Sequence, residues 1–382
     1  MRKIAILGTT GSIGSQALSI VDAYPDKFSI SALSAHSNAV ELFNLVRKYR
    51  PSAAALTSGE VQIPEDLSFC NWYFGETALE KITRDVPCDD VLVSVVGMSA
   101  LKAVINAIDT GKRVLLANKE TIVAGGNIIM PKCDLFSENA NLIPIDSEHS
   151  AIHQCLLGAK DNAFNSLILT ASGGPFRTWS IKEMQNVRPE DALKHPTWDM
   201  GKKITIDSAS MFNKALEIIE AKWLFSAEPS QIDVLVHPES IVHSMVEYKD
   251  FAVMAQLGVP DMRTSIMYAM FYPVRMGAVS ERLNLADIHT LHFEKPDTEC
   301  FPSIALAYDA LRLGGSAPCV LNAANEIAVE AFLNGKIGFL NIADTVKYVL
   351  SKELPKAKNA DEIIYADNWA RCRASEYIDS IN

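Results

Sequence analysis

The sequence lacks the features of a membrane or secreted protein. No apolar run reaches the ~18 residues that a membrane-spanning helix needs. The seven cysteines are widely spaced and none forms a C-x-x-C motif, so we expect reduced, structural thiols. The chain runs from Met1-Arg2-Lys3 directly into an apolar segment at Ile4, without a signal-peptide pattern. We therefore expect a cytoplasmic location.

Positive charge is also scarce. The 35 Lys and Arg residues are outnumbered by 46 Asp and Glu residues, and the formal net charge is -11. This balance argues against broad nucleic-acid binding and against docking on an anionic membrane, although it allows a local cationic pocket for a phosphorylated small molecule. Hydrophobic residues make up 48% of the 382 positions, which predicts a large core and two or three domains.

The first 145 residues or so alternate apolar segments with helical patterns. Such alternation predicts a parallel, doubly wound α/β sheet. The expected strands are Ile4–Leu7, Phe28–Leu33, Val91–Val96 and Val114–Leu116, and the expected helices are Ser12–Tyr24, Val40–Tyr49 and Ser99–Ile108.

The pattern changes after residue 146. Three neighbouring, hairpin-like strands at 233–236, 241–248 and 251–257 predict a central α+β domain, and we expect a helical domain after it. The polar stretch Trp179–Lys203 predicts a long loop with short helical pieces. The expected domains are 1–146, 147–275 and 301–382, with a linker at 276–300. The other expected elements are strands at Leu167–Leu169, Asp233–Val236, Ile241–Tyr248 and Phe251–Leu257, and helices at Ser208–Phe225, Ser303–Leu313, Asn322–Leu333 and Ala343–Leu350.

A glycine-rich segment, Gly8–Gly14, follows the first expected strand and opens a helix. Its G-x-x-G-x-x-G spacing is a variant of the dinucleotide fingerprint of Rossmann-like domains, in which the backbone and a helix N-terminus cradle a pyrophosphate. The alternative is a plain tight turn. The second strand ends in Ser34–Asn38 without the acid that NAD enzymes usually carry, which favours NADP(H) over NAD(H). Asn118-Lys119-Glu120 ends another strand on the same sheet edge, where ligands bind, and the alternative is a polar turn before a helix.

Three carboxylates, those of Asp146, Glu148 and Glu217, form a candidate metal site. Asp146 and Glu148 lie on one side of the chain if this segment is extended. Asn213, Lys214 and Glu217 share one face of the helix expected at 208–225. Oxygen ligands without a Cys or His cluster favour Mg²⁺ or Mn²⁺, with Co²⁺ as a further candidate, over zinc. The alternatives are solvated turn acids and an ordinary surface Lys–Glu pair.

Several small polar residues are candidates for a phosphate site. Ser172-Gly173-Gly174 follows a strand, and Ser208 begins an expected helix. His195 and Trp198 offer a titratable group and an aromatic cover. We interpret His237 and His243 as structural residues without an acidic partner nearby in the sequence, and leave His149 open.

Six segments resemble the 1-deoxy-D-xylulose 5-phosphate reductoisomerase family in sequence and order, and the resemblance spans the whole chain. They are GTTGSIG at 8–14, LANKE at 116–120, PIDSEHSAI at 144–152, TASGGPF at 170–176, HPTWDMGKKITIDSASMFNKALEIIEA at 195–221 and HPESIVHSMVEY at 237–248. The resemblance implies a homodimeric enzyme that uses NADPH and a divalent metal to convert 1-deoxy-D-xylulose 5-phosphate into 2-C-methyl-D-erythritol 4-phosphate, in non-mevalonate isoprenoid biosynthesis.

The resemblance also implies roles for individual residues. The metal ligands are Asp146, Glu148 and Glu217, which with Lys119 and His195 form the catalytic set. The substrate contacts are Lys119, Ser147, Glu148, Ser172, His195, Trp198, Ser208, Asn213, Lys214 and Glu217. The cofactor contacts are Thr10, Gly11, Ser12, Ile13, His36, Ser37, Asn38, Asn118, Glu120 and Gly201.

One segment departs from the family pattern. Many members carry Gly-Lys or Gly-Asn-like residues where this chain has His36-Ser37, so His36 takes the place of a lysine at the expected 2′-phosphate. Two other functions compete: another NADP-dependent sugar-phosphate or semialdehyde dehydrogenase, and a non-enzymatic NADP-sensing regulator. The first needs no metal and usually carries a catalytic Cys–His or Lys–His set, and the second needs neither three acids nor a phosphate site.

Overall fold

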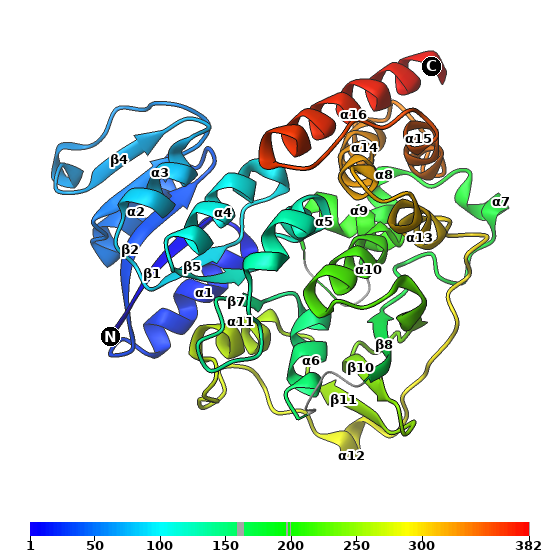
Figure 1. Cartoon of the computed structure of the whole chain (residues 1–382), viewed down its shortest axis with the longest axis horizontal. Helices are drawn as coiled ribbons and strands as arrows, with labels where there is room; N and C mark the ends of the chain where they lie inside the picture. The colour runs from blue at the N-terminus through cyan, green and yellow to red at the C-terminus, as the bar shows by residue number, and fades with distance from the viewer. Residues whose placement is uncertain (159–163, 196–197, 199, 382) are drawn as a thin grey trace. The chain divides into compact units, whose positions relative to one another are not determined.

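The computed structural model describes residues 1–158, 164–195, 198 and 200–381 (Figure 1). Its contacts divide the chain into two compact units. Unit 1 contains residues 1–121, 129–153 and 261–281, and unit 2 contains residues 122–128, 154–260 and 282–382. The domain boundaries expected from the sequence stay a prediction.

Unit 1 is built on a seven-stranded parallel sheet in the order β4-β3-β2-β1-β5-β6-β7. The predicted doubly wound α/β fold is confirmed. The strands are β1 (Arg2–Leu7), β2 (Phe28–Ala35), β3 (Ala53–Leu56), β4 (Asn71–Phe74), β5 (Asp90–Val93), β6 (Arg113–Leu116) and β7 (Leu142–Pro144). The helices that follow them in the chain include α1 (Ser12–Ala23), α2 (Ala39–Tyr49), α3 (Ala78–Asp85), α4 (Leu101–Asp109), α5 (Lys119–Ile129) and α6 (Ser147–Leu156).

Two of the predicted boundaries are wrong. The strand expected to reach Val96 ends at Val93, and the helix expected from Ser99 begins as a 3₁₀ turn at Gly97–Ala100. Gly97 has a φ of +72°, a left-handed conformation that redirects the chain after β5.

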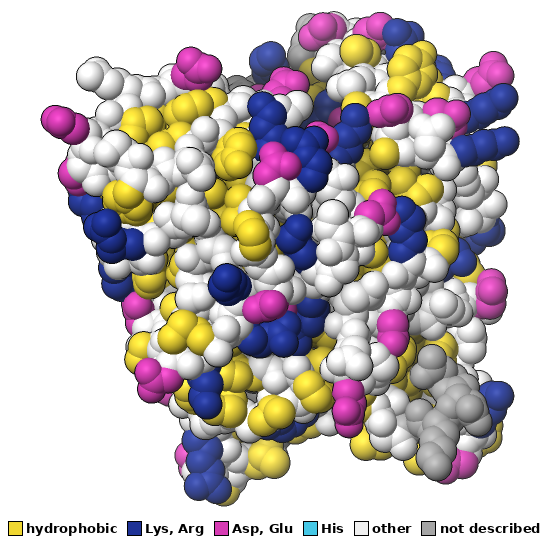
Figure 2. Space-filling model, turned by 60° about the vertical axis from the view of Figure 1, so that its left-hand side comes forward, with side chains coloured by type: hydrophobic (Ala, Val, Ile, Leu, Met, Phe, Trp, Pro, Cys, Tyr) yellow, Lys and Arg dark blue, Asp and Glu magenta, His cyan; other side chains and the backbone are white. Residues whose placement is uncertain are grey.

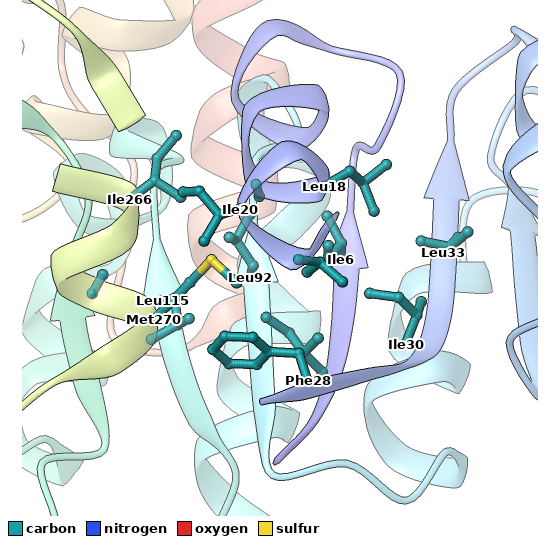
Figure 3. Packing of buried hydrophobic residues seen from close by; sticks show 14 of the residues in the cluster. Ile6, Leu18, Ile20, Phe28, Ile30, Leu33, Leu92, Leu115, Ile266 and Met270 are labelled. Carbon is teal, nitrogen blue, oxygen red and sulfur yellow. The ribbon is translucent and has the colours of Figure 1, made fainter. Parts of the chain in front are cut away.

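The core of unit 1 joins segments that are far apart in the sequence. Figure 3 shows Ile6 and Ile20, from β1 and α1, in one buried cluster with Ile266 and Met270 from α11 (Met262–Phe271). The Phe271 ring of the same segment lies edge-on to Tyr24, with ring centroids 5.0 Å apart. Residues 261–281 therefore belong to unit 1, although the chain passes through unit 2 before it reaches them. Within unit 1, α11 packs against α1.

Unit 2 contains a four-stranded mixed sheet in the order β11-β10-β8-β9. β10 (Val242–Tyr248) and β11 (Val253–Leu257) form the predicted antiparallel hairpin. The prediction of three hairpin-like neighbours is only partly correct. β8 (Phe164–Ala171) lies between β10 and β9 (Ile232–Val236), and it pairs in parallel with β9.

The helix predicted over Ser208–Phe225 is interrupted. α9 (Lys202–Ala209) ends before Ser210, and α10 (Phe212–Phe225) begins after Met211, which has a φ of +62°. Neither glycine nor proline marks this break in the sequence. A tertiary contact accompanies it, because the Ser303 hydroxyl donates to the Ser210 carbonyl at 2.8 Å.

The predicted loop at 179–203 contains two short helices in its described part, α7 (Ile181–Met184) and α8 (Pro189–Ala192). Residues 196, 197 and 199 lie outside the described residues. The predicted linker carries one short helix, α12 (Leu285–Ile288).

The C-terminal part of unit 2 is helical, as predicted. Its helices are α13 (Ser303–Leu313), α14 (Ala317–Leu333), α15 (Asn341–Leu350) and α16 (Ala360–Ile381). None of the helices in the described part of the chain is both long and apolar enough to cross a membrane. On the face drawn in Figure 2, Lys and Arg side chains are interspersed with Asp and Glu side chains.

Candidate active site

The glycine-rich loop lies at the point where the order of the parallel strands reverses. β1 pairs with β2 on one side and with β5 on the other, and ligands of such sheets bind beyond the carboxyl ends of the strands at this point. Gly8 has a φ of +91°, and a Cβ atom there would lie 2.8 Å from the Ser94 carbonyl oxygen. A Cβ atom on Gly14 would lie 2.3 Å from the Gly8 carbonyl oxygen. Both positions therefore require glycine, as in a loop shaped for a dinucleotide.

The predicted pyrophosphate contacts lie at the start of α1. Gly11 is the N-cap residue of this helix and has no side chain to occupy the first N–H groups. Gly11 and Ser12 are exposed, and Thr10 and Ile13 are half-buried. This helix start can accept an anion.

The segment proposed to bind the 2′-phosphate is exposed at the end of β2. His36 Nδ1 lies 2.8 Å from the Thr57 hydroxyl. Asn38 Oδ1 accepts a hydrogen bond from Glu41 N at 3.2 Å and so caps α2. Asn38 therefore has a structural role in addition to any contact with a cofactor, and Ser37 is exposed beside it.

Asn118 joins the loops that follow β5 and β6. Its side-chain amide donates to the carbonyl oxygens of Val95 at 2.9 Å and Gly97 at 3.0 Å, and it lies 2.8 Å from Glu120 Oε2. Asn118 and Glu120 are buried. Asn118 therefore has a structural role at this sheet edge, in addition to any contact with a cofactor.

Asp146 lies between β7 and α6. Lys119 Nζ donates to Asp146 Oδ2 at 2.9 Å, and His149 Nδ1 lies 3.3 Å from Asp146 Oδ1. Burial raises the pKa of Asp146, but Lys119 and His149 oppose this and hold the pKa well below its usual value. Asp146 is therefore ionised at neutral pH, and His149, left open by the sequence, is its neighbour.

The extended conformation assumed for Asp146 and Glu148 is wrong. Glu148 lies in the first turn of α6, and its backbone N–H donates to Asp146 Oδ1 at 3.2 Å. Asp146 acts as a helix cap, which satisfies one of the N–H groups at the start of α6. The Ser147 hydroxyl donates to Glu148 Oε2.

The predicted polar face of α10 is present in unit 2. Lys214 Nζ donates to Glu217 Oε2, and Asn213 Nδ2 donates to Glu217 Oε1 at 2.5 Å. The side chains of Lys214 and Glu217 are only 3% and 1% exposed. The alternative of an ordinary surface pair is therefore wrong, because both charges are removed from water.

Two of the predicted phosphate residues of unit 2, Ser172 and Ser208, lie beside His195. The Nε2 atom of His195 lies 3.1 Å from the Ser172 hydroxyl and 3.0 Å from the Ser208 hydroxyl. Trp198 N donates to His195 Nδ1 at 2.9 Å, so Nδ1 is the acceptor and the proton of the neutral ring is on Nε2. Burial lowers the pKa of His195, which favours this neutral form.

The placement predicted for Ser208 at a helix start is wrong. Ser208 lies in the last turn of α9, so no helix N-terminus supports it. Instead, the backbone of Ser208 packs closely against the loop that follows β8. Gly174 has a φ of +67°, and a Cβ atom there would lie 2.8 Å from the Ser208 carbonyl oxygen.

Gly201 is the exposed N-cap residue of α9, with open space around it. Asp207, a residue of α9 to which the sequence assigned no role, joins this helix to α14. Asp207 is buried and accepts from Asn325 Nδ2 of α14 at 2.8 Å. The 118 positions between the two side chains explain why sequence reasoning missed this contact.

Two histidines were interpreted as structural. For His237 the absence of an acidic partner is wrong, since Glu239 Oε2 lies 3.1 Å from its Nδ1 atom. Its Nε2 atom accepts from the backbone N–H groups of Ile241 and Val242, both at 3.1 Å, which supports the structural interpretation. His243 is buried in β10.

Comparisons with known proteins give one family over most of the chain. Residues 4–126 match the model of 1-deoxy-D-xylulose 5-phosphate reductoisomerase, and residues 142–225 match the model of its C-terminal domain. Residues 257–373 match a second C-terminal domain model, described as DXP reductoisomerase C-terminal domain.

A similar relative is the 1-deoxy-D-xylulose 5-phosphate reductoisomerase of Phocaeicola vulgatus, which is 49% identical over 355 residues that cover 92% of each chain. The solved structure of the reductoisomerase of Zymomonas mobilis in complex with NADPH has a TM-score of 0.89 and 39% identity, and the match covers 99% of each chain. A reductoisomerase structure in complex with NADPH, fosmidomycin and magnesium also has a TM-score of 0.89, with 37% identity over 100% of this chain and 99% of the other. This chain belongs to the 1-deoxy-D-xylulose 5-phosphate reductoisomerase family.

Proposed function

We propose that this chain is the NADPH- and divalent-metal-dependent enzyme that isomerises and reduces 1-deoxy-D-xylulose 5-phosphate to 2-C-methyl-D-erythritol 4-phosphate, in non-mevalonate isoprenoid biosynthesis. The observation that carries this proposal is the family match, which reaches 49% identity over 92% of a reductoisomerase. Related structures hold NADPH and magnesium. The competing NADP-dependent dehydrogenase and sensor functions have no comparable support.

The residues of unit 1 fit the cofactor. A Cβ atom at Gly8 or Gly14 would collide with backbone atoms, so the loop brings bare backbone to the sheet edge where a pyrophosphate binds. When bound, NADPH supplies the hydride for the reduction. The proposed contacts in unit 1 are Thr10, Gly11, Ser12, Ile13, Asn118 and Glu120, with His36, Ser37 and Asn38 near the 2′-phosphate. Gly201 of unit 2 is a further proposed contact.

The donor chemistry of Asp146, Glu148 and Glu217 fits a hard divalent cation, because all three offer carboxylate oxygens. The lowered pKa of Asp146 keeps that ligand ionised. When bound, Mg²⁺ or Mn²⁺ supplies Lewis-acid polarisation of the substrate oxygens.

The remaining proposed residues bind and orient the substrate. Lys119 and Ser147 contact its hydroxylated carbons. Ser172, Ser208, Asn213 and Lys214 contact its phosphate, and Trp198 covers it. His195 contributes a neutral Nε2–H donor, since its other nitrogen already accepts from the backbone. A donor next to two serine hydroxyls suits phosphate oxygens, which only accept hydrogen bonds at neutral pH.

We also propose that two copies of the chain pair through β11. This strand lies at the edge of its sheet, and Val253, Met254 and Leu257 on it are 50%, 49% and 36% exposed. An exposed apolar edge strand is a natural docking surface for a second copy. Val253→Lys should lower the molar mass measured by light scattering from that of a dimer to that of a monomer. The cytoplasmic location stays a prediction.

The test of the activity is NADPH oxidation with 1-deoxy-D-xylulose 5-phosphate, measured with Mg²⁺, with Mn²⁺ and with a chelator. We expect oxidation only with metal, and the product should have the mass of the reduced, rearranged phosphate. Glu217→Gln should abolish turnover and preserve NADPH binding, whereas Glu330→Gln, on the exposed face of α14, should leave turnover unchanged. A folded, NADPH-binding protein that oxidises no NADPH would refute the proposal. Repeating the assay with NADH tests the role of His36.

A further inference from the structure

Two of the three proposed metal ligands share one feature within their own units. Each is neutralised by a lysine that the proposed function assigns to the substrate. In unit 1, Lys119 Nζ lies 2.9 Å from Asp146 Oδ2. In unit 2, Lys214 Nζ donates to Glu217 Oε2.

Both pairs are largely removed from water. The side chains of Lys119 and Asp146 are 10% and 13% exposed, and those of Lys214 and Glu217 are 3% and 1% exposed. A carboxylate in such surroundings needs a compensating positive charge. The lysine in each pair supplies positive charge to its carboxylate, and His149 Nδ1 also lies 3.3 Å from Asp146 Oδ1.

We propose that Lys119 and Lys214 are stand-in counter-ions, which neutralise Asp146 and Glu217 until a divalent cation displaces their ammonium groups from the carboxylates. The inference rests on the proposed function, because it takes these carboxylates as the metal ligands. Once displaced, the two ammonium groups keep their positive charge. They then attract the substrate, whose phosphate and hydroxyl oxygens take over from the carboxylates.

This exchange predicts how the removal of either lysine changes the affinity for the metal. A residue that merely positions a ligand weakens metal binding when it is removed. A lysine that competes with the metal for the same carboxylate does the opposite, because its removal takes away a positive charge that the incoming metal has to displace. Metal affinity therefore separates the two roles, without any measurement of turnover.

The experiment is a titration of the full-length protein with Mn²⁺, without NADPH or substrate, in which the electron paramagnetic resonance signal reports free Mn²⁺. Lys119→Met and Lys214→Met keep most of the side-chain volume and remove the charge. We expect each to lower the Kd for Mn²⁺ about tenfold, a change of about 1.4 kcal/mol. Lys222→Met is the matched control on α10, since the Lys222 ammonium lies over the Trp223 ring, 5.2 Å from its centroid. Its Kd should equal that of the wild type.

Thermal unfolding gives a second readout. Both Met variants should melt below the wild type without metal, and Mn²⁺ should raise their melting temperatures more than that of the wild type. If Lys214→Met does not fold, Lys119→Met and Lys214→Gln carry the same test. Unchanged or weaker Mn²⁺ binding in the folded lysine variants would overturn the inference.

The outcomes also separate this inference from the proposed metal site. Mn²⁺ binding by the wild type that is lost in Glu217→Gln supports the site, whatever the lysine variants do. Mn²⁺ binding that survives both Asp146→Asn and Glu217→Gln removes the site and the inference together. Binding that depends on the carboxylates but is indifferent to both lysines overturns the inference alone.

Discussion

Gly14→Ala should destabilise unit 1 and weaken NADPH binding. The added Cβ atom would lie 2.3 Å from the Gly8 carbonyl oxygen and 2.7 Å from Thr9 Cα. Real Cβ atoms essentially never approach closer than 3.0 Å, so the start of α1 and the Gly8–Thr9 backbone must separate by at least about 0.7 Å. Both obstacles are backbone atoms, so a change of rotamer cannot relieve the overlap.

The size of the effect follows from this displacement. Overpacking of this kind costs about 1–3 kcal/mol. For a domain of this size, each kcal/mol lowers Tm by roughly 2–4 °C, which gives a fall of about 2–12 °C. Moving the start of α1 also removes a backbone donor from the proposed pyrophosphate site. A lost hydrogen bond to a charged group costs about 1.5–3 kcal/mol, so NADPH affinity should fall roughly 10- to 140-fold.

The assay is thermal unfolding by circular dichroism without cofactor, together with an NADPH titration followed by fluorescence. Gly11→Ala is the control for stability, because its Cβ atom would lie 3.4 Å from the same Gly8 oxygen, an ordinary contact distance. Gly11 is itself a proposed cofactor contact, so it is no control for affinity. Wild-type melting and wild-type NADPH affinity in Gly14→Ala would refute the close-packing argument.

Three further predictions concern stability. Gly126→Ala places a Cβ atom 2.3 Å from the Trp223 ring in unit 2, and should lower the free energy of unfolding by about 1–3 kcal/mol in urea titrations. Asp90→Ala leaves Arg113 buried without the carboxylate that it contacts at 2.8 Å, and should lower the free energy of unfolding by about 3–5 kcal/mol. Burial lowers the pKa of His153, so the unfolded chain takes up a proton before the folded one. The urea midpoint should therefore fall as the pH drops below ~6.5, and His153→Gln should reduce that dependence.

Matched variants control these measurements. Gly158→Ala adds a Cβ atom in open space and should leave the stability unchanged. Asp109→Ala removes an exposed pair with Lys132 and should cost less than about 1 kcal/mol. A Gly126→Ala protein as stable as Gly158→Ala, or equal losses for Asp90→Ala and Asp109→Ala, would contradict the packing and pairing arguments.

Local patterns in the sequence were enough to predict most elements. The limits of α13 match the predicted Ser303–Leu313, and β6 lies within one residue of its prediction. Met211 shows where this reasoning fails. Its left-handed conformation divides the expected helix, although the apolar spacing on either side continues without a Gly or Pro. The break depends on packing, because Met211 is buried and Ser303 bonds to the preceding carbonyl.

The sequence by itself determined the α/β class, the glycine loop, the order of the motifs and the types of residue available for a metal and a phosphate. Periodicity and glycine spacing are local properties, and they act within a few residues of the chain. Only the tertiary structure decided that α11 returns to unit 1, that β8 separates β9 from β10, and that His195 lies between Ser172 and Ser208. It also decided that Lys214 and Glu217 are buried rather than solvated. These features depend on contacts between segments that are distant in the sequence. The packing of the whole core determines such contacts, and no local pattern of residues predicts them.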